Sequence, residues 1–252
     1  MDVPEIEFAT VPQFLHSLTS YPHEAWIYRG ESDISRPIIP KAGRPQYYSP
    51  KLDDPDLQES PPPDICRFNH WRKLAIAYHQ SLPENDFDCL AFAQHYGLAT
   101  RLLDWTENPL VALFFAVDSC SKNVGVVYCY SSKWHLDSRK LKIDECPNIA
   151  QFTPPPFDRR ILVQSGVLTY HPDPSEPLVP ESVQDLDVMA PEHGLNLVRF
   201  TIKSGLKPLV KRQLNHFGIN RKTLFPDIEG LSNFINWETE YNANPPSYDD
   251  LE

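Results

Sequence analysis

The chain has 252 residues, of which 41% are hydrophobic and 23% are charged, a composition typical of a globular domain with a sizeable core. Its 34 acidic residues outnumber its 23 Lys and Arg residues, and the net charge of −11 argues against broad, unspecific binding to nucleic-acid backbones. The acidic N-terminus has no apolar stretch, and the longest apolar run, residues 110–117, is too short to span a bilayer. The five cysteines contain no Cys-x-x-Cys pair, so we expect a cytoplasmic protein without a disulfide framework, a structural zinc site or membrane contact.

Hydrophobic periodicity and capping residues predict both helices and strands. In chain order, the pattern predicts a helix at 11–18, a strand at 25–29, helices at 64–82 and 86–96, an extended segment at 100–106, a helix at 109–118, strands at 125–130, 161–170 and 195–202, a helix at 207–217 and a last helix after Asp227. Because helices come first and strands mostly later, we expect an α+β fold in which N-terminal helices pack on a mixed or antiparallel sheet.

Local signals support four of the predicted helices. Thr10 is placed to cap the first helix, and Asn108 followed by Pro109 is a favourable start for the apolar helix at 109–118. Asp86 is the expected cap of the helix at 86–96. In the helix at 64–82, a predicted buried stripe recurs at intervals of three and four residues and consists of Phe68, Trp71, Ala75 and Tyr78.

Proline-rich and acidic stretches determine the expected domain organisation. The 26 prolines concentrate in several connecting segments. The most polar of these segments, residues 45–64, is expected to be an exposed loop. No connection separates two apolar cores, so we expect one domain over residues 1–235, followed by an acidic tail at 236–252.

The first candidate site motif is the run Tyr28-Arg29-Gly30, at the end of a predicted strand. Arginine presents a rigid fork of donors that suits a diphosphate or a carboxylate, and glycine permits the close approach of a ligand or of another backbone. The alternative is a structural salt bridge followed by a glycine turn.

A central polar segment, residues 93–109, is flanked by apolar residues and is the second candidate. Its polar members include His95, Thr100, Arg101, Asp104 and Thr106. Buried polar groups need partners, so each has a structural alternative: Arg101 and Asp104 as a buried pair, His95 as a core histidine, and Asp104 as an acceptor for the next helix. The density of such groups in one segment favours a site.

Two later segments supply further polar candidates. Gln164 lies in the predicted strand at 161–170, where it can point into a pocket or satisfy a sheet edge. Asp227 is well placed to cap the last helix, and Glu229 favours the same end of the helix dipole.

Taken together, these motifs resemble the FRG domain family, named for a Phe-or-Tyr-Arg-Gly motif near its start. The matching segments are residues 26–40, 90–116, 160–166 and 224–231. The departures are Tyr28 for Phe, Ala99 for a usual Pro, and Glu229 for a usual Asp.

A weaker resemblance connects the chain with the ADP-ribosyltransferases, in which an early Arg or His precedes a strand that ends in Ser or Thr and an Ala/Phe-rich helix. This resemblance implies an ADP-ribosyltransferase-like fold with NAD as the cofactor. Arg29 would hold the diphosphate or ribose of NAD, Gly30 would face the nicotinamide amide, and Thr106 with Asp104 would order the nicotinamide ribose.

The same resemblance assigns supporting positions. Tyr28, His95, Thr100, Arg101 and Gln164 would line the cofactor site. A base such as His95 or an acidic side chain would activate the acceptor. The third motif of such enzymes, usually a glutamate, stays open between Gln164, Asp227 and Glu229.

Three functional hypotheses follow. The first is a NAD-dependent ADP-ribosyltransferase that acts on an unknown protein or nucleic-acid acceptor; such enzymes act as toxins or antiphage effectors and can have an antitoxin or regulatory partner. The second is a non-catalytic module that binds a nucleotide or a phosphorylated ligand. The third is a nuclease- or phosphotransfer-like enzyme that uses His95 with Asp104.

Overall fold

The computed structural model describes residues 3–20, 26–48, 61–79, 81–119, 122–140, 142–180 and 196–243, which form an α+β fold around one eight-stranded sheet. The strands are β1 (Glu5–Glu7), β2 (Ile27–Glu31), β3 (Leu102–Thr106), β4 (Gly125–Tyr130), β5 (Trp134–His135), β6 (Ala150–Phe152), β7 (Gly166–Tyr170) and β8 (Leu197–Ile202). They follow the order β1-β8-β4-β2-β3-β7-β6-β5 across the sheet. The two outermost pairs are parallel and the inner pairs antiparallel, so the sheet is mixed, as expected.

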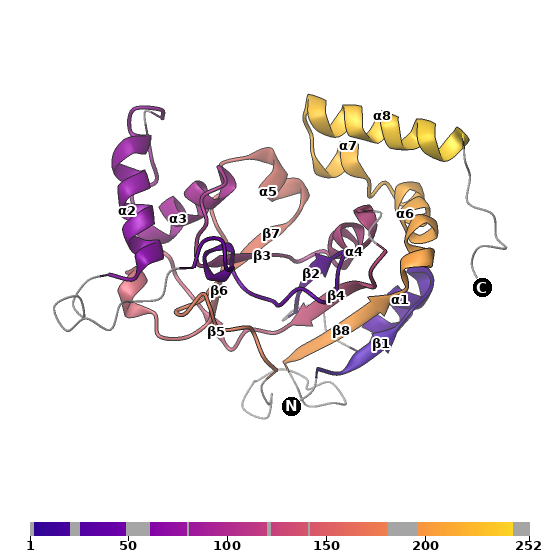
Figure 1. Cartoon of the computed structure of the whole chain (residues 1–252), viewed down its shortest axis with the longest axis horizontal. Helices are drawn as coiled ribbons and strands as arrows, with labels where there is room; N and C mark the ends of the chain where they lie inside the picture. The colour runs from indigo at the N-terminus through magenta and orange to yellow at the C-terminus, as the bar shows by residue number, and fades with distance from the viewer. Residues whose placement is uncertain are drawn as a thin grey trace.

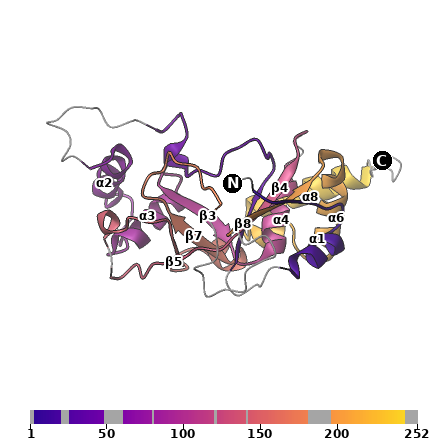
Figure 2. The ribbon, with the colours of Figure 1, turned by 90° about the horizontal axis from the view of Figure 1, so that it is seen from below.

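Two groups of helices lie toward opposite ends of this sheet. The helices are α1 (Val11–Leu18), α2 (Pro63–Ala75), α3 (Asp86–His95), α4 (Pro109–Asp118), α5 (Arg159–Val163), α6 (Lys207–His216), α7 (Arg221–Leu224) and α8 (Ile228–Ala243). In Figures 1 and 2, α2 and α3 lie at one end and α6 and α8 at the other, with α4 nearer the middle. Among the described residues, no helix combines the length and the apolar character that a membrane crossing requires.

The helices cover one face of the sheet with two separate apolar cores. One core joins β2, β4 and β8 to α1, α4 and α6, with Tyr28 and Phe114 among its members. The other joins β3, β6 and β7 to α2 and α3, with Leu102 and Tyr170 among its members. Residues that are register partners in a sheet point to the same face, as Tyr28 and Thr106 do, and likewise Leu102 and Tyr170. Leu102 and Thr106 are four residues apart in β3, so both pairs, and with them both cores, lie on the same face. The face therefore has a gap between the two cores, over β3 and β7.

Several local predictions are confirmed. The Thr10 side chain accepts a hydrogen bond from the Gln13 amide at 3.3 Å and caps α1. The Asn108 side chain caps α4 through the Leu110 amide at 2.9 Å, and Pro109 is the first helical residue. Both signals act within three residues, so they operate regardless of the tertiary fold.

The helix predicted at 64–82 is shorter than expected. It ends at Ala75, and Tyr78, which was expected in its buried stripe, is 90% exposed. Phe68 and Ala75 are buried as predicted. Because helical stability comes mainly from the burial of an apolar face, periodicity that meets no packing surface does not prolong the helix.

The prediction of a strand at 161–170 is wrong for the first half of that segment. Residues Arg159–Val163 form α5, capped by Asp158, which accepts from the Arg160 amide at 2.6 Å. Ser165 then has a positive φ of 47°, and β7 begins at Gly166. A run of apolar residues fits either a strand or a helix, and here the cap and the left-handed turn decide between them.

Three boundaries also differ from the expectation. The cap of α3 is Asn85, which accepts from the Asp88 amide at 2.8 Å, and not Asp86. Within the loop expected at 45–64, residues 49–60 lie outside the described part of the chain, and Pro63 begins α2. Within the tail expected at 236–252, α8 continues to Ala243, and the remaining residues lie outside the described ones.

Candidate functional site

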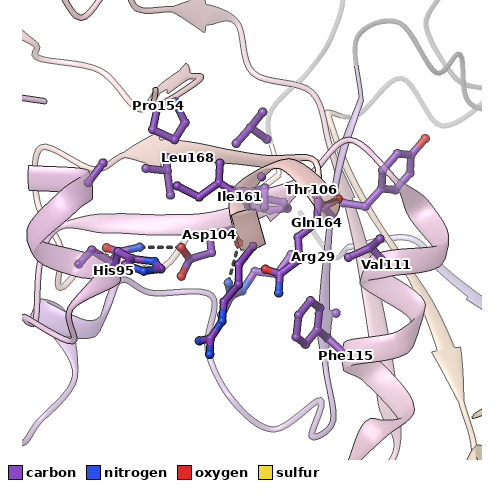
Figure 3. A pocket seen from close by; sticks show the side chains of 18 of the residues that line it. Arg29, His95, Asp104, Thr106, Val111, Phe115, Pro154, Ile161, Gln164 and Leu168 are labelled. Carbon is purple, nitrogen blue, oxygen red and sulfur yellow. Dashed lines mark hydrogen bonds between the residues drawn. The ribbon is translucent and has the colours of Figure 1, made fainter. Parts of the chain in front are cut away.

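A pocket of about 480 Å³ occupies the gap between the two cores. Residues of strands β2, β3 and β7 line its floor, and residues of α3, α4, α5 and the chain after α7 line its walls. Figure 3 shows His95, Asp104, Phe115, Ile161 and Gln164 around the pocket. Its lining includes Tyr28, Arg29, Gly30, Glu31, Gln94, His95, Asp104, Thr106, Phe115, Phe157, Arg160, Ile161, Gln164, Leu168 and Phe225. The volume lies within the range of roughly 300–1,000 Å³ that is usual for small-molecule sites.

Arg29 lies where two strands of the floor separate. In the described part of the chain, β2 and β3 pair at one position, Tyr28 opposite Thr106. Beyond this pair the Arg29 guanidinium bridges the strands, because its Nη1 donates to the Asp104 carbonyl oxygen at 2.6 Å (Figure 3). Its Nη2 donates to the carboxylate of Glu31. Arg29 and the Asp-Trp-Thr segment thus share one pocket.

Gly30 is required by the packing of α4 on β2. A Cβ atom on Gly30 would lie 1.8 Å from the Ala112 carbonyl oxygen and 2.8 Å from the Ala116 amide nitrogen. Its backbone also lines the pocket. The need for glycine therefore comes from the close approach of a helix.

Asp104 and Thr106 project from β3 with different hydrogen-bond partners. The Asp104 carboxylate accepts from Gln94 Nε2 at 2.7 Å, and the side-chain oxygen Oε1 of Gln94 accepts from the Thr100 hydroxyl. The Thr106 hydroxyl donates to the Gln164 carbonyl oxygen at 2.6 Å and accepts from the Asn108 amide at 3.0 Å. Asp104 therefore offers a carboxylate to the pocket, whereas Thr106 also joins β3 to the neighbouring helices.

The pocket lining contains a second guanidinium, that of Arg160. Arg160 lies 5.5 Å from the ring centre of Phe225, and its Nε is 3.1 Å from Asp227 Oδ2. Asp227 accepts from the Gly230 amide at 2.7 Å, and this bond, together with Arg160, lowers the pKa of its carboxyl group. Asp227 is not part of the pocket lining, so it contacts the site through Arg160.

The other two candidates for a third motif differ from each other in position. Gln164 lines the pocket, but at the end of α5, and its Nε2 donates to the Leu224 carbonyl oxygen at 2.9 Å. Glu229 is exposed in the first turn of α8 and does not line the pocket. Neither position brings a carboxylate into the pocket.

Arg101 and Thr100 lie outside the pocket lining, contrary to the expectation that both contact a cofactor. Arg101 is 3% exposed and donates to both carboxylate oxygens of Asp64 at 2.7 Å, to the Tyr170 hydroxyl at 3.1 Å and to the Pro172 carbonyl oxygen at 2.8 Å. Burial by itself would lower the pKa of Arg101, but Asp64 and Tyr170 outweigh it and raise that pKa. Arg101 thus belongs to a buried ion pair, as the structural alternative predicted. The predicted partner, Asp104, is wrong, because the carboxylate that Arg101 contacts is that of Asp64.

His95 and Tyr28 complete the predicted set. His95 lines the pocket, its Nε2 lies 3.4 Å from Asp158 Oδ2, and its ring contacts Phe157 at a centroid distance of 5.5 Å. Tyr28 is fully buried beneath the pocket, and burial raises the pKa of its hydroxyl. Tyr28 therefore contributes its ring to the floor.

Sequence reasoning assigned no role to Glu31, Arg160 or the aromatic walls. Glu31 directly follows the Tyr-Arg-Gly motif, so its proximity to Arg29 was the available signal. Arg160, Phe157 and Phe225 come from distant parts of the sequence, and only the fold brings them together at the pocket.

Comparison with known proteins bears on the first half of this site. The family model of the FRG domain matches residues 24–124, a span that contains β2, α3, β3 and α4, and with them Arg29 and Asp104. No curated protein and no solved structure matches the chain significantly. Arg160, Gln164 and Phe225 lie beyond the matched span. By its Tyr-Arg-Gly strand and its central Asp-Trp-Thr block, the chain belongs to the proteins that carry an FRG domain.

Proposed function

We propose that this chain binds NAD in the pocket and transfers ADP-ribose from it to a macromolecular acceptor in the cytoplasm. One observation carries the proposal: two guanidiniums and two carboxylates line a single pocket that also has aromatic walls. The charged residues are Arg29, Arg160, Glu31 and Asp104. NAD likewise combines opposite charges with flat rings, because its nicotinamide is cationic and its diphosphate is anionic.

The arginines suit the diphosphate. A guanidinium has five N–H donors, and the hydrogen bonds of Arg29 to Asp104 and Glu31 leave others for a ligand. The side chain of Arg160, which also lines the pocket, is 40% exposed and therefore accessible to a ligand. Bidentate hydrogen bonds from arginine to phosphate are both strong and directional, so these residues would hold the diphosphate and position the scissile bond.

Asp104 suits the reacting end of the ligand. Cleavage of the bond between nicotinamide and ribose develops positive charge on the ribose, as in glycoside hydrolysis. One Asp104 oxygen is fixed by Gln94, which orients the carboxylate toward the pocket. A preoriented anion beside the developing charge lowers the barrier.

A non-catalytic module that binds NAD or another phosphorylated ligand is the second candidate. The observation in its favour is that Gln164, Asp227 and Glu229 supply no carboxylate to the pocket. In that case the arginines and aromatic walls bind the ligand without turnover.

The test incubates the purified chain with NAD labelled on the adenylate group, with and without a cell extract, and measures free nicotinamide and macromolecule-bound label. We expect nicotinamide release in the wild type and a loss of at least about 100-fold in Asp104→Asn. Glu107→Gln is the matched control, since Glu107 is an exposed carboxylate three residues further along the chain. NAD binding in calorimetry without nicotinamide release would favour the binding module, and absence of binding would contradict both candidates.

The proposal extends to cells. A chain that consumes NAD or modifies an essential acceptor would act as a toxin or antiphage effector and would need an antitoxin or another regulatory partner. Expression of the wild type is then expected to arrest growth, and Asp104→Asn is expected to relieve the arrest.

A further inference from the structure

One side of α3 faces the pocket and carries both Gln94 and His95. Ala91, Gln94 and His95 all line the pocket, and their spacing of three and four residues places them on the same side of a helix. The Gln94 side chain donates to the Asp104 carboxylate at 2.7 Å, so this side of α3 lies over the face of β3 that carries Asp104. In Figure 3, His95 and Asp104 lie at the same end of the pocket. The imidazole and the Asp104 carboxylate therefore border the same part of the pocket.

Two rings and one carboxylate hold the His95 imidazole in place. The ring of Phe157 packs edge-on against it at a centroid distance of 5.5 Å, and the ring of Tyr96 does so at 5.2 Å. The Nε2 atom of His95 lies 3.4 Å from Oδ2 of Asp158. Among the described residues, the other ring nitrogen, Nδ1, has no hydrogen-bond partner. An imidazole with one nitrogen beside a carboxylate and the other one free can accept a proton from a bound group.

Asp158 is itself oriented by α5. Its Oδ1 accepts a hydrogen bond from the Arg160 amide at 2.6 Å and caps the helix, which leaves Oδ2 for His95. A carboxylate in this position holds an imidazole in one orientation and stabilises the imidazolium that forms when the base takes up a proton. The distance of 3.4 Å exceeds that of an ordinary hydrogen bond, and contacts between catalytic groups are often this long before the ligand binds.

A purely structural ion pair between α3 and α5 is the alternative explanation. The side chains of His95 and Asp158 are 21% and 36% exposed. An ion pair with this exposure contributes little to stability, because water screens it. Phe157 and Arg160, which lie on either side of Asp158 in the sequence, both line the pocket. The pair is thus of little use to the fold, whereas it stands where a proton acceptor is useful to a ligand's reaction.

We propose that Asp158 positions His95 as the general base that activates the acceptor; this inference rests on the function proposed above. The bond between the nicotinamide nitrogen and ribose C1′ breaks, and its electron pair leaves with the nicotinamide, which becomes neutral. The acceptor's oxygen or nitrogen forms the new bond to C1′, and its proton passes to Nδ1 of His95, which later releases it to solvent. Asp104 stabilises the charge on the ribose, and Asp158 stabilises that on the imidazolium. With water as the acceptor, the same base produces ADP-ribose.

Two substitutions test this role. His95→Ala removes the base, whereas Asp158→Asn removes only the charge beside it, because asparagine caps a helix as well as aspartate does. We expect kcat for ADP-ribose transfer and for NAD hydrolysis to fall about 100-fold or more in His95→Ala and about tenfold in Asp158→Asn. The dissociation constant for NAD should change by less than about threefold in both, since neither side chain is assigned to the diphosphate. Added imidazole is expected to restore part of the rate of His95→Ala.

The controls separate a role in catalysis from a role in packing. His216→Ala is the matched variant, because His216 is likewise the last residue of a ten-residue helix, α6, but is exposed and lies outside the pocket lining. It should keep the wild-type rate. A double variant with both His95→Ala and Asp158→Asn should be no slower than His95→Ala alone, because Asp158 acts through His95.

The outcomes distinguish this inference from the function on which it rests. If the wild type forms ADP-ribose and His95→Ala does so at the same rate, His95 is not the base and the proposed function stands. If His95→Ala loses activity together with NAD affinity and imidazole restores nothing, His95 binds the ligand or supports the fold, and the inference is overturned. If Asp158→Asn slows the reaction as much without His95 as with it, Asp158 does not position the base. A folded wild-type chain that binds no NAD or releases no nicotinamide would show that the enzyme and its base are both wrong.

Discussion

The Nη1 atom of Arg29 donates a hydrogen bond of 2.6 Å to the main-chain oxygen of Asp104, across the gap between β2 and β3. The strands pair at Tyr28 and Thr106, and the guanidinium takes over as the connection beyond that point. Arg29 therefore connects the two strands beyond the point where their pairing ends, and it is one of the residues that line the pocket.

Replacement of Arg29 by alanine is expected to weaken NAD binding by about 10- to 100-fold, because charge-assisted hydrogen bonds to a phosphate are worth roughly 1.5–3 kcal/mol. Calorimetry measures this change, and circular dichroism checks the fold. Lys203→Ala, which removes an exposed cation paired with Glu7, is the control and should bind as the wild type does. Wild-type affinity in a folded Arg29→Ala chain would remove the main support for the proposed site.

Replacement of Gly30 by alanine is expected to disrupt the packing of α4 on β2. The added Cβ would lie 1.8 Å from a backbone oxygen of Ala112, and a helix backbone cannot yield by the required distance without losing its contacts. A large drop in melting temperature, or insolubility, is the expected result. Gly205→Ala is the matched control, since nothing lies within 4 Å of a Cβ at that position. Equal melting temperatures of the two variants would refute this explanation.

Replacement of Arg101 by methionine is expected to lower the free energy of unfolding by about 3–5 kcal/mol, because it leaves the buried carboxylate of Asp64 without its partner. The side chains of this pair are 4% and 8% exposed. Urea denaturation measures the loss. Lys140→Met, at an ion pair whose side chains are 79% and 47% exposed, should leave the urea midpoint unchanged. A similar midpoint for both variants would show that Arg101 is not a structural anchor.

His171 is expected to make the chain less stable in acid. Burial, followed by the nearby charge of Arg29, lowers the pKa of His171 from 6.5 to about 4. The Thr169 hydroxyl accepts from Trp105 Nε1 at 2.9 Å and lies 3.0 Å from His171 Nε2, so the imidazole is held within a buried polar cluster. As the pH falls from about 6.5 to about 4, the imidazole takes up a proton first in the unfolded chain, and stability is lost over that window.

The expected loss from this one group is about 3 kcal/mol between neutral pH and pH 4. Urea midpoints at a series of pH values measure it. In His171→Gln, which can still form a hydrogen bond with Thr169 but does not titrate, the decline between pH 6.5 and pH 4 should be shallower than in the wild type. Parallel curves for the two chains would contradict the assignment.

Much of the fold and part of the site could be predicted from the sequence. The caps Thr10 and Asn108 and the apolar helix α4 were predicted correctly, because their signals act over a few residues. Tyr78 and the first half of the segment at 161–170 were predicted wrongly, because periodicity does not reveal which surface, if any, covers an apolar side chain.

The sequence by itself determined the local elements and the central motif, including the succession of Arg29 and Asp104 that marks the FRG domain. Only the tertiary structure decided which polar groups face one another. Arg101 pairs with Asp64, 37 residues away, and Arg160 with Asp227, 67 residues away. The physical reason is that capping and amphipathicity are short-range effects, whereas the partners of a buried charge depend on strand order and helix packing over the whole chain.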